Sequence, residues 1–279
     1  MNVADRQRPP PGELVLDHVS HFVADLDAAA RACEALGFKV TATSVQQTPE
    51  GPVGASNRCV MLEEGYIELL SPTHDTPAAN RMRGLMRRYD GVHLLCFGTP
   101  DAEGEHQRLQ SHGYEPQPLV DLARAVDGGT ARFKVVRPAP DKMPEGRIQY
   151  VEHLTPEHVW RAPEMNPLRL TEVFVVADDP VETAARWARF AALLPQAHEG
   201  GVRLETGRGR IFIGTREAVA NLLGDAPPAP AIGGYGLGCG DPQAFAARCA
   251  GVKLGMRKTT AGHAVSLPSA LGGVWLLRA

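Results

Sequence analysis

One order of predicted elements recurs along the chain, and it constrains the fold more than any other feature of the sequence. Residues 14–23 are mostly apolar and predict a strand, and residues 25–36 predict a short amphipathic helix that acidic residues open and a glycine closes. Three strand-like stretches follow at 39–44, 58–62 and 66–70, with a turn ending in Gly65 between the last two. The unit is therefore β-α-β-β-β.

The same order returns three more times. The returning strands and helices cover 91–97 and 101–112, then 170–177 and 180–194, then 235–239 and 242–250. The closest internal match pairs the segment Tyr66 to Pro72 with Tyr150 to Pro156, in which five positions are identical or conservatively exchanged. This duplication predicts an α+β fold of tandem βαβββ units in two modules. We expect an N-terminal tail at 1–13, a first module at 14–160 and a second, metal-free module at 161–279.

Composition narrows the class of protein. The 279 residues are enough for two domains with hydrophobic cores, and the apolar and charged fractions of 43% and 22% are ordinary for a globular chain. A formal net charge of −3 gives no reason to expect nucleic acid as a partner. The five scattered cysteines form no C-x-x-C pair, and no apolar stretch resembles a secretory signal or a membrane span. We therefore expect a cytoplasmic protein, monomeric or homodimeric, with no membrane partner.

Four polar residues interrupt otherwise apolar strands at repeated positions. His18 and His93 fall on the opening strands of the first two units, and Glu68 and Glu152 fall on the closing strands. If the two units pair about a pseudo-two-fold axis, these side chains converge. Two imidazoles and two carboxylates suit one divalent ion, such as Ni, Co, Mn, Fe or Zn, and leave two positions for substrate.

Neighbouring polar residues offer alternatives to this ligand set. His21 and His153 are expected to face away from the metal, since adjacent strand residues alternate in direction. Gln149 would replace Glu152 as the fourth ligand if the closing strand were shifted by one residue, because such a slip exchanges the two faces.

The repeated unit and its motifs resemble a known family. Asp17-His18-Val19, Asp25-Leu26-Asp27, Leu36-Gly37-Phe38 and Tyr66-Ile67-Glu68-Leu69 are similar to the vicinal oxygen chelate superfamily, and the surroundings of Asn57-Arg58 and Trp160 are similar to its glyoxalase-like branch. The resemblance implies the same four metal ligands. By analogy it also implies that Asn57, Arg58 and Trp160 line the substrate pocket, although a turn former, a solvated charge and a packing aromatic would look the same. The second module lacks matching ligands.

The expected function follows from the predicted metal and the resemblance. A substrate with adjacent oxygens would occupy the open positions, and the ion would stabilise an enediolate formed by proton transfer, as in a glyoxalase-like lyase or isomerase. Either Glu68 or Glu152 could be the base, and Glu152 is preferred because its strand leads to the module junction. One alternative is an extradiol-type dioxygenase with Fe(II) on His18, His93 and Glu152. Another is a metal-free protein that binds or sequesters a small molecule.

Overall fold

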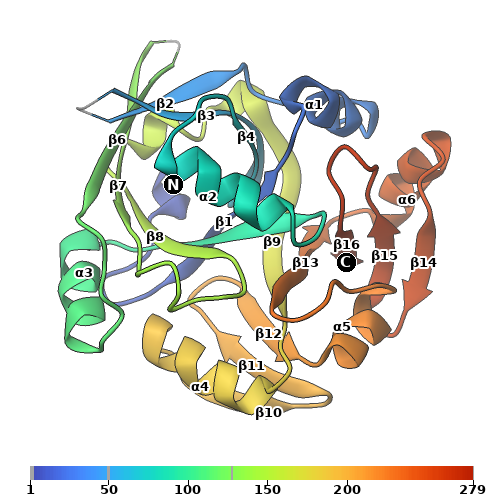
Figure 1. Cartoon of the computed structure of the whole chain (residues 1–279). Helices are drawn as coiled ribbons and strands as arrows, with labels where there is room; N and C mark the ends of the chain where they lie inside the picture. Colours follow the sequence, from blue (N-terminus) through green and yellow to red (C-terminus); the bar gives the residue numbers. More distant parts are fainter. Residues whose placement is uncertain (1–2, 49–50, 127, 279) are drawn as a thin grey trace.

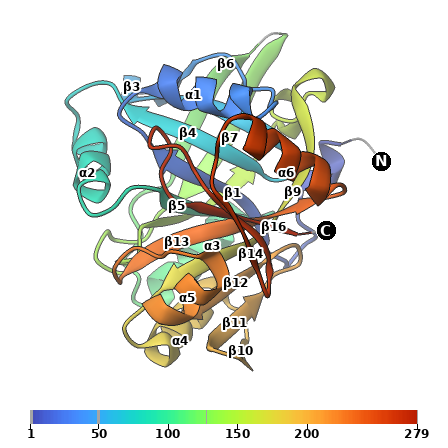
Figure 2. The same cartoon turned by 90° about the vertical axis from the view of Figure 1, so that its right-hand side faces the viewer.

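The computed structural model describes residues 3–48, 51–126 and 128–278, so residues 1, 2 and 279 of the predicted tail and second module lie outside the described residues. Within these ranges the strands form one continuous mixed sheet with helices on its outside (Figure 1). The fold is α+β, as predicted. Figure 2 shows helix α2 at the edge of the molecule, separate from the other helices.

The element order runs as four β-α-β-β-β units. The first unit is β1 (Val15–Phe22), α1 (Leu26–Ala35), β2 (Ser44–Thr48), β3 (Gly51–Glu64) and β4 (Tyr66–Pro72). The second is β5 (Val92–Gly98), α3 (Ala102–Ser111), β6 (Val120–Val126), β7 (Gly129–Val136) and β8 (Arg147–His153). The third is β9 (Met165–Val176), α4 (Pro180–Ala191), β10 (Pro195–His198), β11 (Gly201–Glu205) and β12 (Arg210–Gly214). The fourth is β13 (Ala231–Cys239), α6 (Pro242–Gly251), β14 (Met256–Thr259), β15 (Gly262–Ser266) and β16 (Val274–Arg278).

Two further helices connect units and were not predicted. Helix α2 (Pro77–Met86) joins the first unit to the second, and α5 (Arg216–Leu223) joins the third to the fourth. In Figure 1 the strands of the first two units curve into a ring with α2 in front of it. Thr76 caps α2 by accepting a 3.1 Å hydrogen bond from the Ala79 backbone N–H, and a proline follows the cap.

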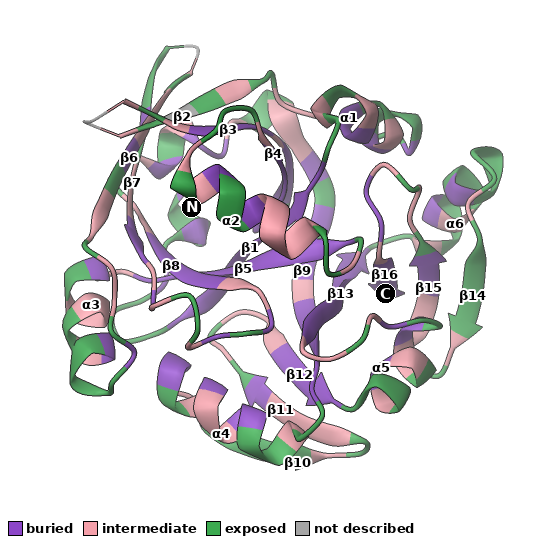
Figure 3. Ribbon diagram, in the orientation of Figure 1, coloured by how far each residue is buried: buried purple, intermediate pink, exposed green. Residues whose placement is uncertain are grey.

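Strand pairing repeats in the two halves of the chain. β1 runs antiparallel to β5 and parallel to β4, and β9 runs antiparallel to β13 and parallel to β12. The halves are not separate sheets, because β3 pairs with β9 through Met61, Leu62 and Glu64. The strands at the centre of each half are buried on both faces (Figure 3).

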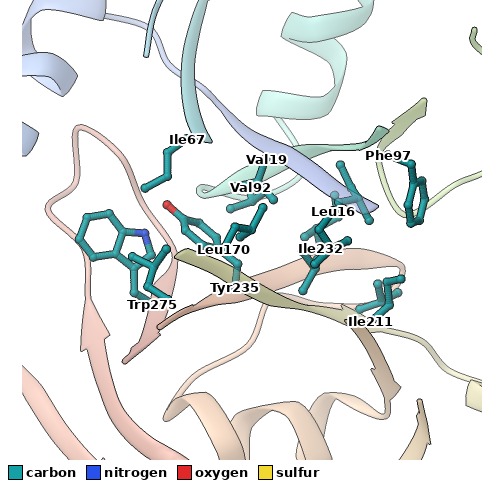
Figure 4. Packing of buried hydrophobic residues seen from close by; sticks show 14 of the residues in the cluster. Leu16, Val19, Ile67, Val92, Phe97, Leu170, Ile211, Ile232, Tyr235 and Trp275 are labelled. Atoms are coloured by element: carbon teal, nitrogen blue, oxygen red, sulfur yellow. The ribbon is translucent and has the colours of Figure 1, made fainter. Parts of the chain in front are cut away.

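The main hydrophobic core lies between the halves. Figure 4 shows Leu16 and Ile67 of the first half facing Ile232, Tyr235 and Trp275 of the second, and all five belong to one buried cluster. Burial of large apolar side chains on this scale stabilises by about 2 kcal/mol for each side chain. The two halves are therefore held together by core packing.

Two expectations about local structure were wrong. The stretch 39–44 is not a strand, because residues 39–43 run as an irregular segment and β2 begins at Ser44. The N-terminal segment is not a free tail: Gln7 is buried, donates a 2.7 Å hydrogen bond to the Glu63 carbonyl and accepts one from the Gly65 N–H at the β3–β4 turn. None of the helices in the described part of the chain combines the length and the apolar character that a bilayer crossing requires.

Candidate active site

An inner cavity of about 40 Å³ lies against strands β1, β3, β4, β6, β7 and β8. Its walls combine apolar residues with a group of polar ones: His18, Asn57, Glu68, Arg124, Arg137, Arg147 and Gln149. Strand pairing places Glu68 beside Ser20, and Gln149 beside Cys96. The cavity therefore collects polar side chains from strands that are otherwise apolar.

The Glu68 carboxylate is held by hydrogen bonds from two sides. Asn57 Nδ2 donates a 2.6 Å hydrogen bond to Oε1, and the Ser20 hydroxyl donates to Oε2. His18 Nε2 lies 4.0 Å from Oε2. Glu68 is only 4% exposed, and its orientation toward His18 is fixed by these neighbours.

A buried aspartate positions the His18 ring. Asp17 accepts hydrogen bonds from His18 Nδ1 at 2.6 Å and from His153 Nε2 at 2.9 Å. Adjacent strand residues normally face opposite sides, but the β1–β5 ladder has a register shift between Leu16 and His18, so Asp17 is the extra residue of a bulge. The bulge allows Asp17 to reach the Nδ1 side of the ring beside it.

These contacts set the charge of the pair. Burial on its own raises the pKa of Asp17, but the charges and hydrogen bonds of His153 and His18 outweigh it and hold the pKa below the ordinary 3.8. Burial on its own lowers the pKa of His18, yet Cys96 and Asp17 raise it well above 6.5. His18 also stacks on Tyr66, with the ring centres 4.3 Å apart. The structure thus favours an imidazolium at His18.

Three arginines line the same cavity, and no salt bridge within the described residues includes any of them. Arg137 Nε donates a 3.0 Å hydrogen bond to Gln149 Oε1, and the Arg147 guanidinium lies 5.2 Å from the centre of the Phe22 ring. Arg124 Nη1 lies 3.8 Å from the Cys59 sulfur. Glu68 is the one carboxylate among the described residues that line the cavity, so its interior is positively charged.

The position of His93 contradicts the predicted four-ligand site. Leu94 lines the cavity, so the neighbouring His93 points to the opposite face of β5. There the ring is stacked between Phe22 and Tyr89, and Nε2 lies 2.8 Å from the Tyr89 carbonyl. Burial lowers the pKa of His93, in agreement with a neutral core histidine.

Glu152 is also outside the site. Arg147, Gln149 and Val151 point into the cavity, so Glu152 faces the other side of β8, where its Oε2 accepts a 3.0 Å hydrogen bond from the Ala102 N–H at the start of α3. Gln149 occupies the cavity position that Glu152 was predicted to take. The one-residue shift that was considered for this strand is the register that the structure has.

The substrate-pocket residues expected by analogy divide in the same way. Asn57 lies in the cavity, but Arg58 contacts carboxylates, with Glu34 at 3.2 Å and Asp27 at 3.7 Å, and does not line it. Trp160 is a buried packing residue behind Tyr66 and hydrogen-bonds the Gly65 carbonyl. The expected orientation of His21 is confirmed, since its ring nitrogens contact Tyr235 and the Leu271 carbonyl in the second half of the chain.

His153 faces away from Glu152, as expected, but it has a role that the sequence did not reveal. Its contact with Asp17 makes it part of the network that holds His18. Ser20, Arg124, Arg137 and Arg147 were also missed. Period-two spacing of Arg147, Gln149 and Val151 on the closing strand was the signal that could have found one of the arginines.

Comparison with known families decides where this fold and site belong. Residues 16–191 match the model of the glyoxalase-like domain, which covers more than half of the chain. The chain belongs to the glyoxalase-like family. Its fold is that of the vicinal oxygen chelate superfamily, to which the glyoxalase-like family is related. No curated protein sequence matches the chain.

Solved structures share the fold of this glyoxalase-like chain at low sequence identity. A hypothetical protein from Staphylococcus aureus is 15% identical with a TM-score of 0.67, over 95% of this chain and 99% of the other. A variant of 4-hydroxymandelate synthase from Streptomyces coelicolor is 15% identical with a TM-score of 0.55, over 95% and 93%. Methylmalonyl-CoA epimerase from the same organism is 22% identical with a TM-score of 0.40, over 51% and 99%.

The residues of the glyoxalase-like cavity do not fit the divalent ion that the resemblance implies. A two-fold rotation about the Val19–Leu95 pair exchanges Glu68 with Gln149, but it exchanges His18 with Leu94, which has no donor atom. No three side chains of the metal-binding types His, Cys, Asp and Glu gather anywhere in the described ranges in a way that could hold a metal. The three arginines around Gln149 would also repel a cation. The predicted metal centre is therefore corrected to a positively charged, hydrogen-bonded site.

Proposed function

We propose that the chain is an enzyme that transfers a proton at a carbon beside a carbonyl group, with Glu68 as the base and His18 as the hydrogen-bond donor to the carbonyl oxygen. The observation that carries this proposal is the 4.0 Å separation of the Glu68 carboxylate and His18 Nε2 at the inner cavity. A carboxylate beside an imidazolium can serve one reacting centre from two directions. The glyoxalase-like family and the fold it shares with the synthase support an enzyme.

The proposed step balances without a co-reactant. Glu68 takes the proton from the carbon, and the C–H electron pair moves to the carbonyl oxygen, which becomes an enolate. His18 Nε2–H donates a hydrogen bond to that oxygen, and the guanidinium groups of Arg137 and Arg147 add positive potential. Return of the proton to the other face or to the neighbouring carbon gives an epimer or an isomer. Positioned general bases of this kind contribute factors of about 10² to 10⁴ in rate.

The size of the cavity limits what can react there. About 40 Å³ of free space corresponds to a few water molecules, since one water needs about 10–15 Å³ measured in this way. A head group of two or three carbons with its oxygens fits, and a larger body does not. The proposal is therefore limited to a substrate whose reacting end is small.

Exchange of solvent deuterium tests the proposal directly. The protein is incubated in D₂O, without oxygen and with a chelator, with a panel of 2-oxoacids and α-hydroxyketones, and loss of the α-proton signal is followed by NMR. We expect enzyme-dependent exchange for at least one compound, and we expect Glu68→Gln to reduce it by about 10² or more. Exchange without metal and oxygen argues against the dioxygenase alternative.

Glu152→Gln is the matched control, because it makes the same chemical change on the outer face of β8. This variant should exchange at the rate of the unchanged protein. The proposal is wrong if Glu68→Gln exchanges as fast as the parent, or if no compound exchanges above background. In the second case, a chain that still binds small molecules would be a binding protein of the sequestering kind.

A further inference from the structure

A second and much larger pocket opens beside the inner cavity. It measures about 580 Å³, which lies within the range of 300–1,000 Å³ that small-molecule sites usually have. Helix α2 contributes Ala78, Arg81 and Leu85 to one wall, and the segment before β8 contributes another. The two pockets share Arg137 and Arg147, which therefore stand where one space meets the other.

The lining of this outer pocket is amphipathic. Most of it is apolar and rigid, with four prolines at 138, 140, 144 and 230, together with Val53, Met143 and Ile148. Its charged members are all arginines, at positions 81, 88, 137 and 147, and no carboxylate from the described residues lines it. Arg88 is already committed to the Pro144 and Pro230 carbonyls. Arg81, Arg137 and Arg147 have no carboxylate partner among the described salt bridges.

Guanidinium groups that crowd together without a counter-ion leave an electrostatic demand. Burial lowers the pKa of Arg147 to about 9, and repulsion from Arg137 and Arg81 adds to that effect. Burial and Arg81 also lower the pKa of Arg137. A bound oxyanion would relieve this repulsion, and the planar, forked donors of arginine match the geometry of carboxylate and phosphate.

We propose that Arg137 and Arg147 bind an oxyanion of the substrate at the junction of the two pockets, while an apolar body of the same molecule fills the outer pocket. This inference rests on the proposed function, since it names the substrate class of the same site. The reacting head would then extend past the arginines toward Glu68 and His18. The substrate class is an amphipathic carboxylate or phosphate with a small oxygenated end.

Direct binding tests this inference without turnover. Isothermal titration calorimetry is carried out on the full chain with three probes that share an eight-carbon tail, namely octanoate, octyl phosphate and the neutral octanamide. We expect at least one anion to bind about 10-fold or more tightly than octanamide, and more weakly as salt rises. Tighter binding of octanoate identifies a carboxylate as the favoured group, and tighter binding of octyl phosphate identifies a phosphate.

Variants locate the anion. Arg147→Gln and Arg137→Gln should each weaken binding of the anion by about 10-fold or more and leave octanamide unchanged, while Arg147→Lys should restore part of the affinity. Arg87→Gln, at the exposed end of α2, is the matched control and should bind as the parent does. Melting curves of each variant establish that it is folded.

The outcomes separate this inference from the proposed function. Equal affinity for octanoate, octyl phosphate and octanamide, or unchanged binding in both glutamine variants, would overturn the anion site. Glu68→Gln should bind the anion without loss even though its deuterium exchange is abolished. Failure of exchange with intact, arginine-dependent binding therefore counts against the base, and not against the anion site.

Discussion

Arg137 Nε donates a 3.0 Å hydrogen bond to the side-chain oxygen of Gln149, at the strand position that mirrors Glu68. A metal ligand at this position would have to direct a lone pair toward the ion, but here the oxygen is engaged by a cation. On the other opening strand, Leu94 replaces the second histidine. Both changes favour an anion where the resemblance implies a metal.

We therefore predict that the chain does not bind a first-row divalent ion in stoichiometric amount. The purified protein is incubated separately with Ni, Co, Mn, Fe(II) or Zn, freed of unbound ion and measured by elemental analysis. His93→Ala and Glu152→Gln should leave the result unchanged, because neither side chain lies at the cavity. One ion per chain that disappears in His18→Ala would contradict this prediction.

Asp17 is predicted to be a positioning residue for His18. Asp17→Asn preserves the size of the side chain but removes the charge that accepts from His18 Nδ1. Deuterium exchange should fall by about 10² to 10⁴, the range in which loss of the orienting carboxylate of a histidine acts elsewhere. The loss should appear in the maximal rate with little change in KM, as expected for a residue that does not touch the substrate.

Asp25→Asn provides the control for that experiment. Asp25 caps α1 through a 2.9 Å hydrogen bond from the Ala28 N–H and contacts no cavity residue, and asparagine caps helices equally well. It should exchange as the parent does. An equal loss in both variants would show that Asp17 acts only through stability.

Arg147→Gln is predicted to stabilise the free protein. The variant removes a buried cation that Arg137 and Arg81 repel, at the cost of its contact with the Phe22 ring. Relief of such strain at a binding site commonly gives about 1 kcal/mol in the free energy of unfolding. Urea unfolding measures it, and Arg87→Gln should change the value by no more than about 0.5 kcal/mol. A clear loss of stability in Arg147→Gln would mean that the arginine is structurally required.

His21 should make the stability depend on pH. Burial lowers its pKa from 6.5 to about 4, since the ring lies between the halves of the chain and contacts Tyr235. The unfolded chain takes up this proton at a higher pH than the folded chain. Its contribution is therefore fully present above pH 6.5 and is lost as the pH falls toward 4, by about 3 kcal/mol.

Urea unfolding at several pH values tests this slope. His21→Gln keeps a donor and an acceptor but does not titrate, so the loss between pH 6.5 and pH 4 should be smaller in the variant. An identical slope in the parent and the variant would assign the pH dependence to other groups. Asp17 adds its own loss below pH 3.8, because its folded pKa is depressed, and the two effects are separated by their ranges.

The sequence by itself determined the order of the elements and part of the site. Period-two and helical patterns, with acidic caps, predict β1, α1 and the turn at Gly65 because these signals are local. The repeat indicated tandem units, and the apolar strands around His18 and Glu68 marked two residues that do lie together. Partnership with Ser20 and Asn57 had no sequence signal of its own.

Only the tertiary structure decided which faces of β5 and β8 line the cavity. β5 is buried on both faces, so its hydropathy shows no alternation that would distinguish His93 from Leu94. The same holds at the centre of β8, where a shift of one residue exchanges Glu152 for Gln149. Pairing across the sheet fixes that register, and the bulge at Asp17 is likewise set by the partner strand. The charge of the site therefore depends on long-range pairing, which turned an expected metal centre into an arginine-lined cavity.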